Sequence, residues 1–223
     1  MILNRETIAR AGLALLDQKG SDGLTMRALA ASLGVQAPAL YWHVKNRREL
    51  IDLMGEEIMR DAHEAFDQTS TPWDVFLTNG ARAIRQAMLR YHQGARILAG
   101  TFVTNGGDVL EPLLDTMTAA GFTVREAARL SPVIYHYTIA FTIEQQARDG
   151  SEYPGPNPYT EENLLAKIDL HKYPTITEAF AELYDPDFDA DFEDGLQVII
   201  DGLRARLRGK RPSAAPRATA PRS

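Results

Sequence analysis

The sequence contains no cysteine among its 223 residues. This absence excludes disulfide bonds, thiolate zinc sites and cysteine nucleophiles. The chain also lacks any run of about eighteen uncharged apolar residues, which a membrane-spanning helix would need. Its charged N-terminal stretch does not suit an export signal. We therefore expect a cytoplasmic protein that does not enter a membrane.

Sequence signatures of catalysis are absent as well. The chain has no nucleophile elbow, no glycine-rich phosphate loop and no paired-histidine helix motif. His92 and His171 are isolated from any combination of a base and an orienting group. We therefore expect a protein that is not an enzyme and that needs no cofactor or metal.

Aromatic residues make up only 8% of the chain, yet 44% of its residues are hydrophobic. That share is enough for a continuous core and lies well above the range of disordered chains. The length fits one large domain, or a small domain docked on a larger one.

Hydrophobic residues recur at helical spacing almost throughout, and no stretch alternates like a strand, so the sequence predicts an all-α fold. Capping boxes at 71–74 and 123–126 mark the starts of two long helices. The expected helices span about 4–20, 25–33, 36–43, 46–66, 72–93, 95–101, 108–120, 124–148, 161–170, 175–184 and 190–208.

Charge is distributed unevenly around a net value of −6. Residues 1–48 hold seven Lys or Arg against three acidic residues, and 202–223 hold seven basic residues and no acidic one. A basic N-terminal segment on an acidic body is compatible with DNA binding, because the affinity for DNA depends on the Lys and Arg side chains that face the phosphates. Uneven surface charge also arises without any function. The Pro-, Ala- and Arg-rich tail from Gly209 is expected to be disordered, either solvated or in nonspecific contact with nucleic acid.

Residues 24–43 have the spacing of two short helices that cross about a tight turn. Gly34 can take the left-handed conformation that the turn needs, and Ala30 is small where the helices approach. Val35 and Leu40 fill the core that the two helices share. The pattern therefore predicts a helix-turn-helix, whose second helix enters the major groove of DNA.

The exposed positions of that second helix have the side chains that such a role requires. Gln36 suits base edges, small apolar groups suit thymine methyls, and aromatic and basic groups suit phosphates. These positions are Gln36, Ala37, Ala39, Tyr41, Trp42 and His43, followed by Lys45, Arg47 and Arg48.

The segment 41–48 closely resembles the tetracycline-repressor (TetR) family. Weaker similarities follow in the same order at 73–79, 94–101, 120–122 and 195–203, so the resemblance covers nearly the whole chain. It implies a three-helix helix-turn-helix head with a larger helical ligand-binding and dimerisation body. We accordingly assign the DNA-binding domain to 1–48, the regulatory domain to 49–208 with a connecting helix at 46–66, and the disordered tail to 209–223.

The resemblance also implies which residues of the head contact the operator. Ala37 and Ala39 stand where the family has polar, base-contacting side chains, so the operator should differ in sequence. Tyr41 and Trp42 could instead pack between the third and fourth helices. Together with the exposed positions, the predicted DNA-binding residues are Thr25, Arg27, Gln36, Ala37, Pro38, Ala39, Tyr41, Trp42, His43, Lys45 and Arg47.

By the same resemblance, the helices at 124–148 and 190–208 form a homodimer, which a palindromic double-stranded DNA operator requires. Each helix carries an apolar stripe, and the alternative is that these stripes are buried within one subunit. The stripes are Ala128, Val133, Tyr137, Ile139 and Phe141 on the first helix, and Phe192, Leu196, Ile199, Ile200 and Leu203 on the second.

The body should hold a small-molecule inducer. Leu98 replaces a metal-binding side chain of the family and Phe102 replaces an arginine, so a magnesium–tetracycline chelate does not fit. The more apolar pocket suits a bulky hydrophobic polycyclic molecule, such as an aromatic polyketide, with His63 and Thr101 orienting its polar atoms. His63 and His136 could instead be structural. The predicted ligand-binding residues are His63, Gly80, Ile84, Leu98, Thr101, Phe102, Val103, Leu113, His136 and Glu144.

The sequence therefore predicts a repressor that an inducer releases from its operator. The alternative is a constitutive or architectural DNA-binding dimer without an inducer. A buried void in the body favours the first hypothesis, and a filled core favours the second.

Overall fold

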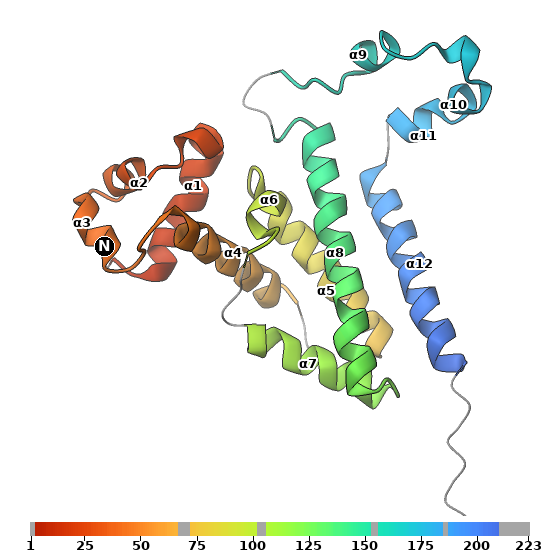
Figure 1. Ribbon diagram of the computed structural model, residues 1–223, viewed down its shortest axis with the longest axis horizontal. Coiled ribbons are helices and arrows are strands. Elements are labelled where there is room, and N and C mark those ends of the chain that lie inside the picture. Colours follow the sequence, from red (N-terminus) through yellow and green to blue (C-terminus); the bar gives the residue numbers. More distant parts are fainter. Residues whose placement is uncertain (1–2, 67–71, 102–105, 153–155, 185–186, 210–223) are drawn as a thin grey trace, which may run out of the picture.

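The computed structural model describes residues 3–66, 72–101, 106–152, 156–184 and 187–209. Over these ranges the chain forms 12 α-helices and one short 3-10 helix, and no β-strand (Figure 1). The predicted all-α fold class is therefore confirmed.

The N-terminal part packs three helices against the start of a longer fourth one. Side-chain caps set three of the four helix starts: Asn4, Thr25 and Asn46 each accept a hydrogen bond from the backbone N–H three residues on, at 2.7, 3.1 and 3.0 Å. Such caps satisfy N–H groups that the helix itself leaves unpaired. The helices are α1 (Arg5–Gly23), α2 (Met26–Ser32), α3 (Ala37–Tyr41) and α4 (Arg47–Glu64).

The remaining helices form the body, in which α8 and α12 run side by side and α7 crosses near one end of α8 (Figure 1). Short helices between α8 and α12 form an arm over the opposite end. The body consists of α5 (Trp73–Leu89), α6 (Gly94–Leu98), α7 (Gly106–Ala119), α8 (Val124–Arg148), α9 (Glu161–Leu165), a 3-10 helix (Leu170–Lys172), α10 (Pro174–Glu178), α11 (Phe180–Tyr184) and α12 (Phe188–Arg208).

The structure differs from the predicted elements mainly in the arm and at one cap. The helices expected at 161–170 and 175–184 are replaced by shorter ones, because this segment packs little against the body and buries few residues. The box at 123–126 is confirmed. For the box predicted at 71–74, Thr71 lies outside the described residues, and the N-cap of α5 is Pro72. The carboxylate of Asp74, which the box would direct to the helix start, pairs with Arg204 at 2.5 Å.

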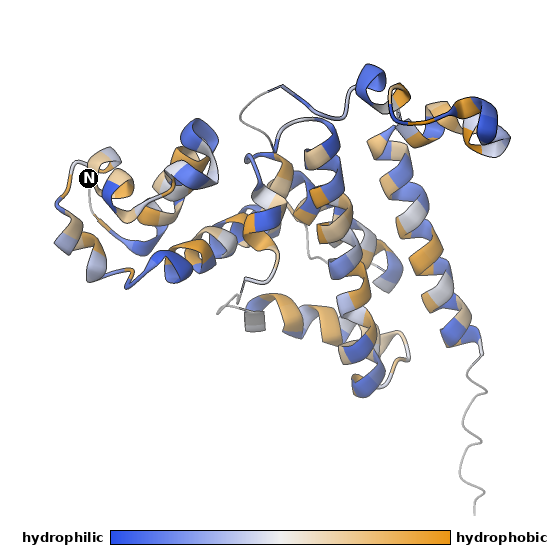
Figure 2. Cartoon of the chain, turned by 45° about the horizontal axis from the view of Figure 1, so that its top comes forward, coloured by the Kyte–Doolittle hydropathy of each residue, from blue (hydrophilic) through white to orange (hydrophobic). Residues whose placement is uncertain are grey.

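Two hydrophobic clusters hold the molecule together. One joins α1–α3 to α4 and α6, and the other joins α5, α7, α8 and α12. Apolar residues accordingly follow the inward faces of the helices (Figure 2). The first cluster also includes Met88 of α5 and Ile139 of α8, so α4, which belongs to it along most of its length, joins the N-terminal helices to the body.

The apolar stripe predicted on the last helix is mostly buried within the subunit. Phe192, Leu196 and Ile200 are 0–2% exposed and pack on α5 and α8, as the alternative interpretation held. The outward face of the same helix pair shows Val133 and Val198, which are 45% and 74% exposed. No described helix is long and apolar enough to cross a membrane.

Candidate nucleic-acid interface and ligand cavity

The helix-turn-helix forms as the sequence predicts. Gly34 adopts φ +67°, which favours glycine, and the Val35 N–H donates to the Ala30 carbonyl at 3.0 Å to close the turn. Leu40 is fully buried between the helices. Pro38 lies in the first turn of α3, where its missing N–H leaves no helical hydrogen bond unmade. These features hold α3 against α2 and leave one side of α3 free.

The predicted DNA-binding side chains lie on the surface of this head. Trp42 is 89% exposed and Tyr41 is 50% exposed. The packing alternative is therefore not supported for Trp42, whereas half of the Tyr41 surface is covered by neighbouring residues. Of the remaining residues, Ala37, Ala39 and His43 are partly buried, and Thr25, Arg27, Gln36, Pro38, Lys45 and Arg47 are exposed.

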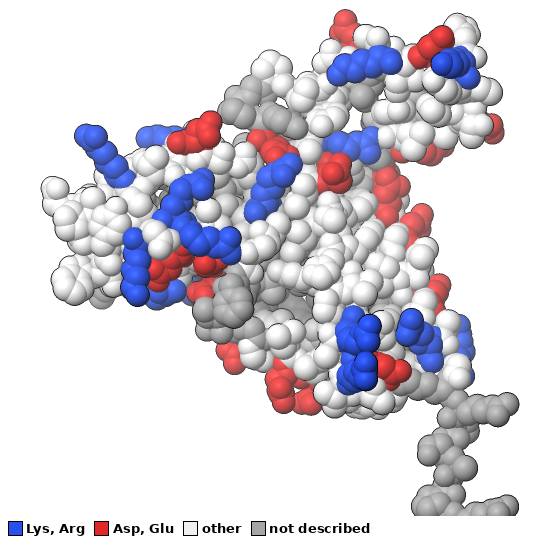
Figure 3. Space-filling view, in the orientation of Figure 1, with Lys and Arg blue, Asp and Glu red and all other residues white. Residues whose placement is uncertain are grey.

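Arg47 also has a structural contact that the sequence did not reveal. Its guanidinium donates to the carbonyls of Ser21 and Leu24, each at 3.4 Å, and so braces the start of α4 against the α1–α2 turn. The head bears several Lys and Arg side chains on the face shown in Figure 3.

A cavity of about 320 Å³, which we call the body cavity, lies between α4, α5, α7 and α8. Carbon atoms dominate its walls. Gly80 opens it further, since a Cβ there would meet no other atom within 4 Å. The lining residues are Met59, Ala62, His63, Phe66, Phe76, Leu77, Gly80, Ala81, Ala83, Ile84, Thr101, Val109, Leu110, Leu113, Ser131, Pro132, Ile134, Tyr135 and Thr138.

The structure brings only part of the predicted ligand set to this cavity. His63, Gly80, Ile84, Thr101 and Leu113 line it. Phe102 and Val103 lie outside the described residues.

Three predicted ligand residues do not line the cavity in this subunit. Leu98 is fully buried in the cluster that joins the head to α4 and α6. His136 and Glu144 are exposed on α8, eight residues apart and therefore on one face of the helix. The cavity instead receives the face of α8 that carries Tyr135 and Thr138.

Sequence reasoning missed the aromatic part of the wall. The rings of Phe66 and Phe76 meet edge-to-face with centroids 4.9 Å apart. Burial raises the pKa of the Tyr135 hydroxyl, which therefore stays protonated and can donate a hydrogen bond inside the cavity. The spacing of Ser131, Tyr135 and Thr138 along α8 was the available signal, but it equally fits an ordinary core face.

Two contacts join α4 to the segment that follows α6 and lines the cavity at Thr101. Thr101 packs so closely on Gly55 that a Cβ at Gly55 would lie 2.5 Å from its methyl group. The guanidinium of Arg48 donates to the Gly100 carbonyl at 2.6 Å and pairs with Asp52 at 3.0 Å. These contacts join the segment after α6 to the helix that carries the head.

Within the ranges that the structure describes, no group of three or more His, Asp or Glu side chains could hold a metal ion. An exposed recognition helix, on a helical body that encloses an apolar cavity, defines a helix-turn-helix transcriptional regulator with a ligand-binding body.

Comparison with known proteins identifies the family. Residues 8–54 match the family model described as bacterial regulatory proteins, tetR family, and residues 67–207 match the tetracyclin repressor-like C-terminal domain. The chain therefore belongs to the TetR family of transcriptional regulators.

Individual relatives agree along almost the whole chain. The tetracycline repressor protein class A from transposon 1721 of Escherichia coli is 38% identical over 208 residues, which is 92% of each chain. A possible TetR family transcriptional regulator from Streptomyces coelicolor A3(2) has a TM-score of 0.79 at 33% identity, covering 91% of this chain and 100% of that one. ActR of Streptomyces coelicolor, in complex with actinorhodin, has a TM-score of 0.74 at 28% identity, covering 92% and 96%.

Proposed function

We propose that this protein is a cytoplasmic repressor that binds a palindromic operator as a homodimer and is released by a bulky, hydrophobic polycyclic molecule. The body cavity of about 320 Å³ is the observation that carries the proposal. A half-open apolar cavity of this size is typical of a small-molecule site, and a constitutive or architectural DNA binder does not need one.

Operator binding is assigned to α3 and its flanks. Gln36, at the start of α3, can read a base edge, while the methyl groups of Ala37 and Ala39 suit thymine. Lys45 and the exposed rings of Tyr41 and Trp42 suit the phosphate backbone, which positions the head without reading sequence.

The choice of ligand follows from the walls of the cavity. Aromatic and aliphatic side chains favour a planar apolar ring system, and the Tyr135 hydroxyl, His63 and Thr101 supply a few polar contacts to orient it. Leu98 is a buried hydrocarbon and offers no ligand to magnesium. The relative ActR, whose structure contains actinorhodin, supports a metabolite as the inducer.

Release from DNA is assigned to α4. The Thr101 side chain packs on Gly55 of α4, so a ligand that displaces Thr101 would disturb this contact. The hydrogen bond from Arg48 to the Gly100 carbonyl connects the segment at 100–101 to the start of α4. The α4 helices would then tilt, and the two heads would no longer fit successive major grooves. A difference of a few kcal/mol in ligand affinity between the two states is enough for such a switch.

Dimerisation is assigned to the outward face of α8 and α12, where Val133 and Val198 are exposed. His136 and Glu144 lie on the exposed side of α8. The family resemblance implies that both residues belong to a ligand site, and we propose that in a two-fold pair this site is the partner's.

The test begins with selection of bound duplexes from a random-sequence pool, which identifies the operator. Polycyclic compounds of two to four rings are then screened for thermal stabilisation and for release of that operator. We expect the selected sequence to be an inverted repeat, and at least one compound both to stabilise the protein and to release DNA. A non-repeated target, or a complete lack of stabilisation across the panel, would refute the proposal.

A further inference from the structure

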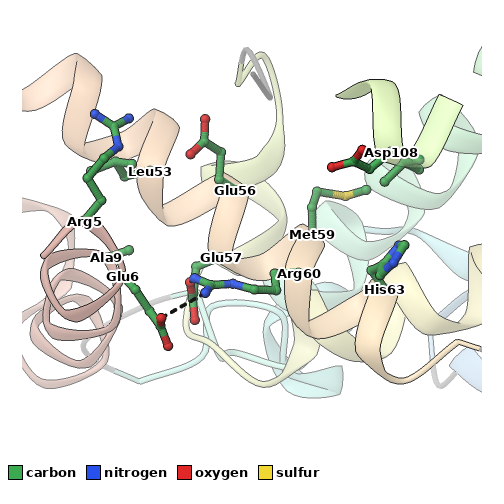
Figure 4. Close-up of a pocket in the computed structure, with 11 residues that line it drawn as sticks. Arg5, Glu6, Ala9, Leu53, Glu56, Glu57, Met59, Arg60, His63 and Asp108 are labelled. Atoms are coloured by element: carbon green, nitrogen blue, oxygen red, sulfur yellow. Dashed lines mark ion pairs between the residues drawn. The ribbon is translucent and has the colours of Figure 1, made fainter. Parts of the chain in front are cut away.

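A second cavity, of about 420 Å³, lies between α1, α4 and α7 and is shown in Figure 4. We call it the hinge cavity, because α1 belongs to the head and α7 to the body. Its walls are charged where those of the body cavity are apolar: Glu6 comes from α1, Glu56 and Arg60 from α4, and Asp108 from α7. No part of the proposed function uses it.

The two cavities are neighbours. Met59, His63 and Val109 line both of them, so the same three side chains form the boundary between an apolar space and a charged one. Figure 4 shows Met59 and His63 on α4 with Asp108 close by, at the side of the hinge cavity that faces away from α1. The two cavities meet at these side chains, so a substituent that extended from the body cavity past His63 would enter the hinge cavity.

The balance of charge in the hinge cavity is negative. Four carboxylates and two guanidinium groups line it, and a third guanidinium, that of Arg10 on α1, pairs with Glu57 at 2.8 Å and with Glu6 at 3.4 Å. Both guanidinium groups that line it are already paired, Arg60 with Glu6 at 3.2 Å and with Glu57, and Arg5 with Glu49 of α4 at 3.3 Å.

Asp108 differs from these paired groups, since it forms no ion pair with any other residue that the structure describes. Asp108 is exposed and Glu56 is partly buried, so the excess of carboxylates in this space favours a cation over an anion by a modest amount.

We propose that the natural ligand is amphipathic: an apolar ring system fills the body cavity, and a flexible arm ending in a protonated amine passes His63 into the hinge cavity, near Glu56 and Asp108. This inference rests on the proposed function, because it places the ring system in the same body cavity. It adds the chemical class of the ligand, a polycyclic compound with a cationic substituent.

The test uses matched synthetic probes. Naphthalene, anthraquinone and tetracenequinone carboxamides each carry one of three arms: dimethylaminopropyl, the uncharged analogue with carbon in place of the amine nitrogen, and an arm of similar length ending in carboxylate. Affinities are measured by calorimetry with the full chain at neutral pH. We expect the amine to bind about three- to fivefold more tightly than its uncharged analogue, with a smaller ratio at high salt.

Two variants locate the effect. Asp108→Asn and Glu56→Gln are each expected to reduce the preference for the amine and to leave the affinity of the uncharged analogue unchanged. Asp115→Asn is the matched control, because Asp115 is exposed two turns further along α7 and lines neither cavity. The control should keep the full preference.

The outcomes separate the two proposals. If the uncharged probes bind but the amine has no advantage, or the carboxylate binds best, the inference is wrong and the proposed function stands. If Asp115→Asn loses the preference as much as Asp108→Asn does, the effect is general electrostatics and the inference also fails. If no probe of any ring size binds, both proposals are overturned.

Discussion

The residue type alone does not say whether a side chain packs or binds DNA, and its exposure helps to distinguish the two roles. Tyr41 and Trp42 could either pack or bind, and their exposed rings favour binding. Arg47 shows the reverse case, because an exposed basic side chain next to the recognition helix also braces the α1–α2 turn. Removing Arg47 would therefore mix a lost phosphate contact with a disturbed head, and Lys45 is the cleaner probe of phosphate binding.

The first prediction separates base reading from phosphate binding. Gln36→Ala should change the preference at particular base pairs of the selected operator, each by about 1–3 kcal/mol. Lys45→Ala should weaken binding to all sequences alike and reduce the salt dependence by about one charge. Fluorescence anisotropy with single-base operator variants at several salt concentrations measures both effects. Equal changes of sequence preference in the two variants would contradict these roles.

The second prediction concerns acid stability. The hydrogen bond from Arg204 holds the pKa of Asp74 below its usual value. A carboxyl whose pKa is lowered by folding stabilises the protein above the unfolded pKa of about 3.9, and this contribution disappears as the pH falls through the folded value.

Asp74→Asn should therefore reduce the free energy of unfolding at pH 7 by up to about 1 kcal/mol, since the pair is partly exposed to solvent. Near pH 3 the difference from the wild-type protein should shrink. Urea unfolding at both pH values measures this, with Asp115→Asn as a control. A loss of equal size at both pH values would show that the ion pair is not the cause.

Among the helices, α4 has a special place because it contacts both halves of the molecule. It packs on α1 in the head and on α5 and α6 in the body. Its side chains include Met59 and His63, which border both cavities. A ligand in either space touches the helix that carries the DNA-binding head.

The third prediction tests the contact between α4 and the end of α6. Gly55→Ala would place a methyl group 2.5 Å from the Thr101 methyl, so one segment must shift. We expect a loss of about 1–3 kcal/mol in unfolding free energy, as for other overpacked cores. Adding Thr101→Ala removes the clashing groups and should restore much of that loss.

A double-mutant cycle by urea unfolding measures the coupling between the two positions. Gly107→Ala serves as the control, because a Cβ at Gly107 meets no atom within 4 Å. If Gly55→Ala costs no more than Gly107→Ala, the close approach between α4 and Thr101 is not a constraint on this helix.

For the whole molecule, the proposed palindromic operator requires two heads, because one head would read only half of it. The inward faces of α8 and α12 are already used to hold the subunit together. What remains for a partner is the outward face, where Val198 is 74% exposed.

The fourth prediction follows from this face. Val198→Asp should leave the helix content unchanged and convert a dimer into a monomer, because pairing would bury an uncompensated carboxylate. Loss of the second head should weaken operator binding at least about tenfold. Analytical ultracentrifugation and anisotropy measure the two effects. Val75→Asp, on an exposed position of α5, is the control, and a dimer that persists in Val198→Asp would place the interface elsewhere.

Features that depend on neighbours along the chain could be predicted from the amino-acid sequence alone. Asn4, Thr25 and Asn46 cap the helices that they were expected to begin, and Gly34 makes the predicted turn. The helix-turn-helix was readable because all its parts lie within residues 24–43. The arm was not, because short helices with little burial depend on weak local preferences.

Contacts between residues of different helices could not be predicted in this way, because they depend on how the helices pack. The body cavity draws its walls from four helices over residues 59–138, so no local pattern could assemble them. On α8, Tyr135 and His136 are adjacent in the chain, yet the first faces the cavity and the second faces outward. The sequence of a helix can leave more than one face available for burial, and the helices that pack against it determine which face is buried.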